Sequence, residues 1–225
     1  MTAIHPIYPL NDPMPKAAAD APIGIFDSGI GGLSVAQEIA RHLPNEHIVY
    51  YADTAHVPYG PRDDQEIREL TAHAIEWLYR KGCKVAVVAC NTASAFSLDY
   101  LRAHYGENFP IIGLVPALKP AVLQSKTKTV AVLATPATFR GQLIKEIVER
   151  FAKPAQVQVM PVTNLDLVPF VEAGAQMSAA CLQTLQEILQ PAVDQGADFL
   201  VLGCTHYPFL KPAIQHIFGQ KLTLI

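Results

Sequence analysis

Two cysteines occupy similar settings in the two halves of this 225-residue chain. Cys90 ends the run VAVVAC before an Asn-Thr pair, and Cys204 ends the run LVLGC before a Thr-His pair. A thiol beside such donors, between a strand end and a helix start, is expected to have a pKa below its free value of about 8.5. With a pair of thiols on opposite sides of one α-carbon, one could remove its proton as a thiolate, and the other could return a proton to the opposite face. The paired setting therefore predicts a two-base racemisation site.

A glycine-rich segment follows the first apolar run and reads Asp27-Ser28-Gly29-Ile30-Gly31-Gly32. Its backbone N–H groups could approach a carboxylate at a helix N-terminus, although the glycines could also form only a tight turn. The dinucleotide fingerprint would need glycine at position 34, where the chain has Ser34, and no phosphate-binding loop motif occurs. Nucleotide binding is therefore not predicted.

Removal of an α-proton without a pyridoxal cofactor requires fixed donors in a dry site. The candidate donors lie in the segments just described: Ser28, Asn91, Thr92 and Thr205. The titratable side chains that could tune the thiols are Asp27, His206 and Glu172. His206 could equally be an ordinary hydrogen-bonding residue, and Glu172 could lie on a helix surface.

The remaining cysteines are predicted to be structural, because Cys83 leads into a strand and Cys181 lies on the apolar stripe of a helix. A zinc site of Cys90, Cys204 and His206 would lack both a C-x-x-C pair and a fourth ligand at a familiar spacing. We expect neither a metal nor a cofactor.

Eight short apolar runs alternate with amphipathic stretches and predict the elements that hold these residues: IGIF, HIVYYA, VAVVA, PIIGLV, TVAVLA, VQVMPV, DFLVLG and LTLI. Their continuous hydrophobicity indicates parallel strands covered on both faces. Helices are expected at 33–43, 63–81, 94–105, 138–152 and 177–195. The helix at 63–81 has an apolar stripe of Ile67, Leu70, Ala74, Trp77 and Leu78, with Gly82 as its stop.

An internal similarity indicates two halves. The run IGIFDS resembles VAVLAT at an offset similar to that between the two cysteine segments. The predicted fold is α/β, with two similar domains at 23–115 and 116–225. Each is a mainly parallel sheet flanked by helices, and the active site is expected in the cleft between them. Residues 1–22, rich in proline, are expected to form an irregular extension.

Composition limits the partners. Half of the residues are hydrophobic, 16% are charged and the net charge is −3, without a run of Lys or Arg, so neither nucleic acid nor a membrane surface is an expected partner. No secretory signal or membrane-spanning apolar run is recognisable, and the cysteines do not form a disulfide framework. A cytoplasmic protein with a small-molecule substrate is expected.

Four segments, FDSGIGGLSV, YADTAHVPYGPR, ACNTAS and GCTHYP, resemble the signature segments of the glutamate racemases in this order. The resemblance implies cofactor-independent interconversion of L- and D-glutamate, which supplies D-glutamate for peptidoglycan. It implies that Cys90 deprotonates D-glutamate and Cys204 deprotonates L-glutamate. The implied substrate contacts are Asp27, Ser28, Tyr59, Gly60, Asn91, Thr92, Thr205 and His206. Asp53 and Glu172 correspond to further acidic residues near the site.

Three features depart from this pattern. His56 stands where many members have Arg or Lys, and LATPATF replaces a Gly-Thr segment, which leaves contacts from Thr135 and Thr138 open. The sequence stops at Ile225, whereas family members continue with a segment that returns to the first domain. Reduced stability or activity is expected without that segment.

Other functions fit part of the pattern. An aspartate or other acidic amino-acid racemase would use the same two thiols, since one methylene discriminates by only about 1–3 kcal/mol. A cysteine hydrolase would use one thiol with His206 as its base, and a non-catalytic amino-acid-binding module would use neither. The oligomeric state is open, with a homodimer as one alternative.

Overall fold

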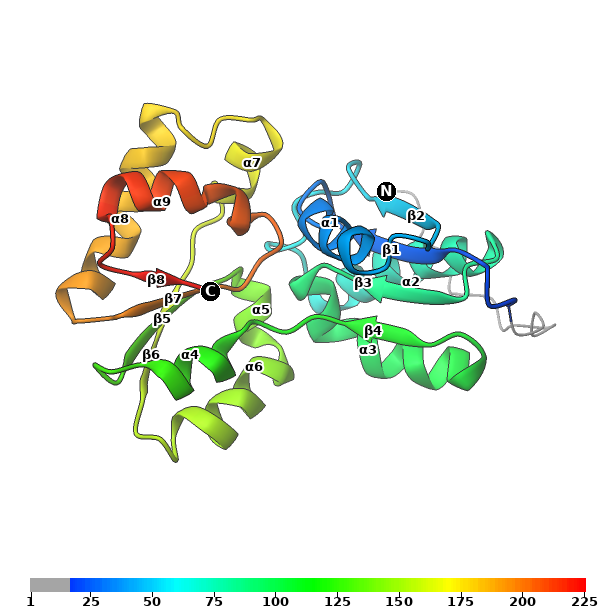
Figure 1. Cartoon of the computed structure of the whole chain (residues 1–225), viewed down its shortest axis with the longest axis horizontal. Coiled ribbons are helices and arrows are strands. Elements are labelled where there is room, and N and C mark those ends of the chain that lie inside the picture. Colours follow the sequence, from blue (N-terminus) through cyan, green and yellow to red (C-terminus); the bar gives the residue numbers. More distant parts are fainter. Residues whose placement is uncertain (1–16) are drawn as a thin grey trace. The chain divides into compact units, whose positions relative to one another are not determined.

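The computed structural model describes residues 17–225, which divide into two compact units, with the boundary between Leu114 and Val115. Each unit contains a four-stranded parallel sheet with helices on both faces (Figure 1). The predicted class, α/β with two similar parallel-sheet domains, is confirmed. Of the extension expected at 1–22, residues 1–16 lie outside the described part of the chain.

All eight apolar runs form strands. In the first unit the sheet order is β2-β1-β3-β4, and in the second it is β6-β5-β7-β8, with every neighbouring pair parallel. The strands are β1 (Ile23–Asp27), β2 (Ile48–Ala52), β3 (Val85–Val88), β4 (Ile111–Gly113), β5 (Thr129–Leu133), β6 (Gln158–Val162), β7 (Phe199–Leu202) and β8 (Thr223–Leu224). The two sheets therefore have the same topology, as the internal similarity predicted.

Helices cover both faces of the first sheet. They are α1 (Leu33–His42), α2 (Asp64–Arg80) and α3 (Asn91–Tyr105), followed by a 3-10 turn η1 (Gly106–Asn108). On one face, Ile23 and Ile25 of β1 form a core with partly buried residues of α1. On the other, Gly24 faces Leu78 of α2. The central strand β1 is thus covered on both sides, which explains its uninterrupted apolar sequence.

The predicted stripe of α2 is correct except at one position. Ile67, Ala74 and Leu78 are fully buried, but Trp77 is 40% exposed. Its ring packs edge-on against Tyr51 at 5.3 Å between centroids, and the Lys81 ammonium lies 5.1 Å from the ring centre. Trp77 therefore lies at the surface of this unit, and its prediction as a core residue was wrong.

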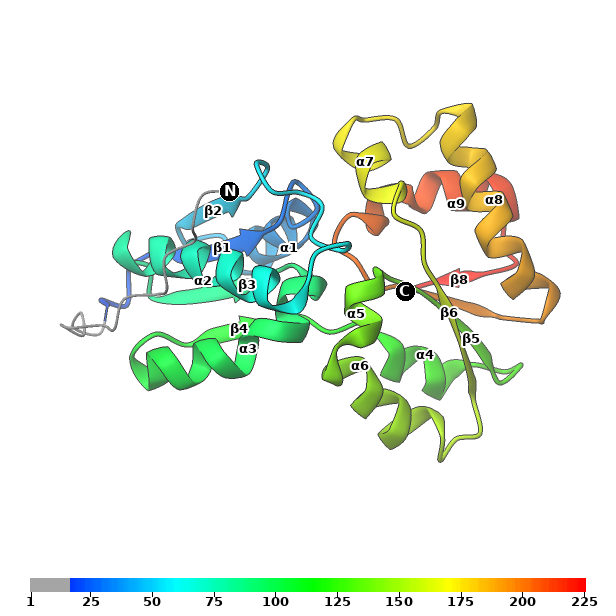
Figure 2. The ribbon, with the colours of Figure 1, turned by 180° about the vertical axis from the view of Figure 1, so that it is seen from behind.

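In the second unit α8 confirms the helix predicted at 177–195, and the other helices are short. The helices of this unit are α4 (Leu118–Gln124), α5 (Pro136–Arg140), α6 (Gln142–Ile147), α7 (Leu167–Glu172), α8 (Ala179–Asp194) and α9 (Lys211–Phe218), with a π-helical turn η2 (Val148–Ala152) and a 3-10 turn η3 (Tyr207–Leu210). The single helix expected at 138–152 was wrong, because Gly141 adopts an extended conformation and separates α5 from α6. Figures 1 and 2 show α4 and α6 on one side of the second sheet and α8 and α9 on the other.

The two cysteines predicted to be structural are buried and free. Burial raises the pKa of both the Cys83 and the Cys181 thiols, as expected for packing residues. Across residues 17–225, no helix combines the length and the apolarity needed to cross a membrane.

Candidate active site

Three neighbouring strands bring the predicted residues of the first unit to one edge of its sheet. At the ends of β1 and β2, the N–H of Asp53 donates to the carbonyl of Asp27 at 3.0 Å, and Cys90 follows the end of β3 on the other side of β1. Asp27, Asp53 and Cys90 are all buried. The expectation that strand ends gather the polar residues is therefore met within this unit.

The glycine-rich segment organises Asp27. The Gly29 N–H donates to Asp27 Oδ2 at 3.0 Å, and a Cβ added at Gly32 would lie 2.5 Å from Asp27 Cβ. Close approach therefore requires glycine at position 32. However, the first three N–H groups of α1, at 33–35, donate to the carbonyls of 30–32 at 3.0–3.2 Å. These three donors are already bonded, and an anion site at the N–H groups of the glycine segment itself stays a prediction.

Cys90 is the N-cap of α3. Its Sγ accepts a hydrogen bond from the Ala93 N–H at 3.4 Å and donates one to Ser28 Oγ at 3.6 Å. Asn91 and Thr92 form the buried first turn of the same helix. Ser28 thus contacts the thiol, and Asn91 and Thr92 follow it at the start of the helix.

The predicted low pKa of Cys90 is wrong. Burial, reinforced by the negative charge of Asp27, raises the pKa of Cys90 to about 12, although the Ala93 N–H and Ser28 oppose the shift. Cap donors do favour the thiolate, but burial outweighs them. Cys90 is therefore a thiol at neutral pH in this structure.

Asp53 joins two neighbours in a buried chain of hydrogen bonds. Tyr59 Oη donates to Asp53 Oδ2 at 2.6 Å, and His56 Nδ1 lies 2.7 Å from Asp53 Oδ1. Burial and this bond raise the pKa of Tyr59 far above its ordinary value, with Cys90 a further cause. Tyr59 and the following Gly60 are buried near the thiol. The pairing of His56 with Asp53 was not predicted, although their i,i+3 spacing is compatible with it.

The second unit gathers its candidates at the equivalent strand ends. The Gly203 N–H donates to the carbonyl of Leu133 at 2.8 Å, which joins the ends of β7 and β5. A Cβ at Gly203 would lie 2.9 Å from Ala134 Cβ, so glycine lets β7 end against the neighbouring chain. Cys204 and Thr205 follow it and are buried.

Cys204, His206 and Glu172 form a line of contacts. Cys204 Sγ lies 3.8 Å from His206 Nδ1, and His206 Nε2 lies 2.6 Å from Glu172 Oε1. Thr205 Oγ1 is 3.5 Å from the same Nδ1. An ionised carboxylate accepts only, so Nε2 carries the proton that Glu172 binds. In a neutral imidazole Nδ1 is then the acceptor, and it faces the thiol.

Glu172, which from the sequence could have lain on a helix surface, is the last residue of α7 and is paired with His206. The two thiols have different neighbours: Cys90 lies beside a hydroxyl and a carboxylate, and Cys204 beside an imidazole that is bonded to a carboxylate.

Thr135 and Thr138, which the sequence left open, are buried at the start of α5. The Thr138 N–H donates to Thr135 Oγ1 at 3.2 Å, and the two hydroxyl oxygens are 2.9 Å apart. Both threonines therefore take part in capping α5.

Within residues 17–225, no group of three or more His, Cys, Asp or Glu side chains is arranged to hold a metal ion.

Comparison with known proteins identifies the family of the chain. Residues 23–225 match the family model described as Asp/Glu/Hydantoin racemase. The chain is 54% identical over 215 residues to a glutamate racemase of Deinococcus radiodurans. The aligned region covers 96% of this chain and 73% of that protein. The chain also resembles the Escherichia coli glutamate racemase, solved with L-glutamate and the activator UDP-MurNAc-ala, with a TM-score of 0.80 and 35% identity over 91% of this chain and 77% of that one. The Francisella tularensis enzyme, solved with D-glutamate, has a TM-score of 0.77 and 32% identity over 91% and 75%.

Proposed function

The chain belongs to the Asp/Glu/Hydantoin racemase family, among the glutamate racemases, and on this premise we propose that it interconverts L- and D-glutamate without a cofactor. One observation carries the proposal. Each unit has a buried thiol two residues past the end of the topologically equivalent strand, Cys90 after β3 and Cys204 after β7. A two-base exchange at one carbon requires two groups that can each accept and donate a proton, and the two thiols can do both.

In the proposed reaction, glutamate binds with one thiol on each side of its α-carbon. Cys204, whose proton can pass to His206 Nδ1, removes the α-proton of L-glutamate as a thiolate. Cys90, a thiol at neutral pH, donates its proton to the opposite face and yields D-glutamate. The reverse reaction starts from the opposite protonation states.

The surrounding residues have matching proposed roles. Glu172 holds the His206 ring and stabilises its charged form. Asp27 disfavours the Cys90 thiolate and so favours proton donation from it. Asp53 fixes the hydroxyl of Tyr59. The proposed contacts to glutamate are Ser28, Tyr59, Gly60, Asn91, Thr92, Thr205 and His206, with Asp27 at the same edge.

The test is circular dichroism of each glutamate enantiomer with the native chain, with Cys90→Ala and with Cys204→Ala, together with solvent deuterium incorporation at the α-carbon. The native chain is expected to abolish the optical signal and to incorporate deuterium. Each variant should lose racemisation severely. Nearly full turnover by either variant would exclude the two-base assignment. Parallel runs with aspartate measure the preference between the two acids.

The contacts of Cys204 with His206 and of His206 with Glu172 also favour a second candidate, a cysteine hydrolase. Such an enzyme would cleave an activated ester and would leave the α-hydrogen of glutamate unexchanged. It would also tolerate Cys90→Ala, whereas the racemase would not.

We further propose that the product serves bacterial peptidoglycan synthesis and that the protein acts in the cytoplasm. A homodimer is the proposed alternative to a monomer, and light scattering distinguishes the two.

A further inference from the structure

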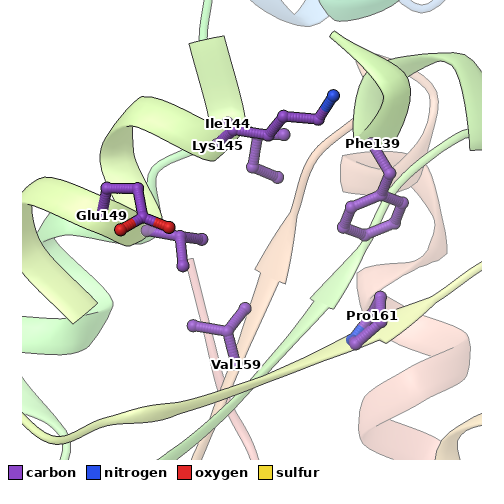
Figure 3. A pocket seen from close by; sticks show the side chains of 7 residues that line it. Phe139, Ile144, Lys145, Glu149, Val159 and Pro161 are labelled. Carbon is purple, nitrogen blue, oxygen red and sulfur yellow. The ribbon is translucent and has the colours of Figure 1, made fainter. Parts of the chain in front are cut away.

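The second unit contains a pocket whose lining residues include none of those proposed for racemisation. Its volume is about 240 Å³, and it is lined by residues of α5, α6, η2 and the edge strand β6. The lining residues are Phe139, Ile144, Lys145, Val148, Glu149, Val159 and Pro161 (Figure 3). Five of these seven side chains are apolar, so the walls suit an apolar body.

The pocket exists because the helical layer does not cover the edge strand fully. Ile144 belongs to the buried core beneath α6, and Val148 and Val159 are only partly buried against that core. On β6, Val159 and Pro161 have i,i+2 spacing and point to the same face, toward the helices. The Phe139 ring forms a wall at the α5 end.

The π-helical turn η2 forms one side of the pocket. In η2 the Lys153 N–H donates to the carbonyl of Val148 at 3.0 Å, an i→i+5 bond that widens the turn. Val148 and Glu149 line the pocket from the first two residues of this turn. Such turns occur frequently at functional sites.

The charges around the pocket favour an anion. Glu149 is paired with Lys153 at 2.5 Å, whereas Lys145, one turn earlier, has no ion pair with any residue of the described chain. Figure 3 shows Lys145 extending toward the Phe139 side, with the Glu149 carboxylate on the opposite side.

The segment that surrounds the pocket in sequence has a positive net charge. Residues 118–153 carry seven Lys or Arg side chains and two Glu, a net charge of +5, in a chain with a net charge of −3. These cations are spread over 36 positions, so no run in the sequence reveals them. Packing brings two of them to one ring: Lys119 Nζ and Arg150 Cζ lie 4.7 and 5.4 Å from the centre of Phe151.

We propose that this pocket binds a small carboxylate with an apolar body, an aromatic or branched acid, with its carboxylate on Lys145 and its body against Phe139, Val148 and Val159. The volume accommodates a single ring with a short side chain. The proposal does not depend on racemisation.

Phenylacetate is the probe, with phenylacetamide as its neutral counterpart and acetate as the charge without the ring. Methyl-detected NMR of the full chain follows Ile144, Val148 and Val159. We expect saturable shifts of these methyl groups with phenylacetate, and binding at least about threefold weaker for the other two probes.

Lys145→Met should weaken phenylacetate binding about three- to fivefold, because it removes one partly solvated ion pair. Lys126→Met, at an exposed lysine outside the pocket lining, is the matched control and should change the affinity little. Val159→Trp, which fills the pocket from the edge strand, should abolish the shifts, with circular dichroism verifying its fold.

Equal affinity for phenylacetate and phenylacetamide, or an unchanged affinity in Lys145→Met, would overturn the proposal. So would methyl shifts that are absent here and instead arise beside Cys204. None of these readouts uses glutamate turnover, so a failure of this site is distinguishable from a failure of the racemase assignment.

Discussion

His206 Nε2 lies 2.6 Å from Glu172 Oε1, although the two residues are 34 positions apart and belong to different elements. The pair orients the imidazole so that its other nitrogen, Nδ1, faces the sulfur of Cys204 at 3.8 Å. His206 is almost fully buried, so its ring has few other orientations available. Glu172 therefore acts on Cys204 through the histidine and is a positioning residue.

Glu172→Gln is expected to reduce racemisation about 100-fold, because an amide neither stabilises the imidazolium nor selects the tautomer. Turnover of each enantiomer by circular dichroism measures the loss. Glu187→Gln, on the exposed face of α8, is the control and should retain activity. A Glu172→Gln chain with native turnover over the whole pH range would remove Glu172 from the mechanism.

Asp27→Asn should lower the pKa of Cys90, because it removes the negative charge that disfavours the thiolate. Each pKa unit of lowering increases the thiolate fraction at pH 8 about tenfold. Alkylation of Cys90 by iodoacetamide, followed by mass spectrometry of its peptide, should therefore be faster. Asp99→Asn, on the exposed face of α3, serves as the comparison. Equal alkylation rates in the two variants would contradict the role of Asp27.

Stability should fall at alkaline pH. The pKa of Cys90 is about 12 in the folded chain and about 9 when exposed, so folding favours its protonated form. Its contribution to stability is complete below pH 9 and is lost as the pH rises toward 12. Urea unfolding between pH 8 and 11 should show this decline, with a shallower slope for Cys90→Ala. Identical slopes would indicate that other groups, such as Tyr59, account for the loss.

Gly203→Ala should destabilise the chain by about 1–3 kcal/mol, because the new Cβ would lie 2.9 Å from Ala134 Cβ and 3.2 Å from the carbonyl oxygen of Leu133. Urea denaturation measures the free energy of unfolding. Adding Ala134→Gly removes the shortest of the three close contacts and should restore part of the lost stability. Full native stability in the single variant would mean that the strand ends shift easily.

The elements were predictable where the pattern was long enough. All eight apolar runs form strands. The central strands β1 and β5 are fully buried, as expected for a parallel strand that is covered on both faces and is apolar throughout. The helices α4, α7 and α9 were not predicted, since six to eight residues contain too few turns to show a periodic stripe. Trp77 matched the stripe of α2 but lies at its edge, where Tyr51 and solvent share the ring.

The sequence alone determined which residues carry the proposed chemistry, because Cys90 and Cys204 follow strands of recognisable composition and every parallel strand ends at the same edge of its sheet. Only the tertiary structure decided their environments. Burial raises the pKa of Cys90 by more than its hydrogen-bond donors lower it. Segments that are distant in the sequence together bury the thiol, so the sequence around Cys90 does not reveal this effect. The partner of His206 was equally undetermined, since packing of α7 and not chain proximity brings Glu172 to it.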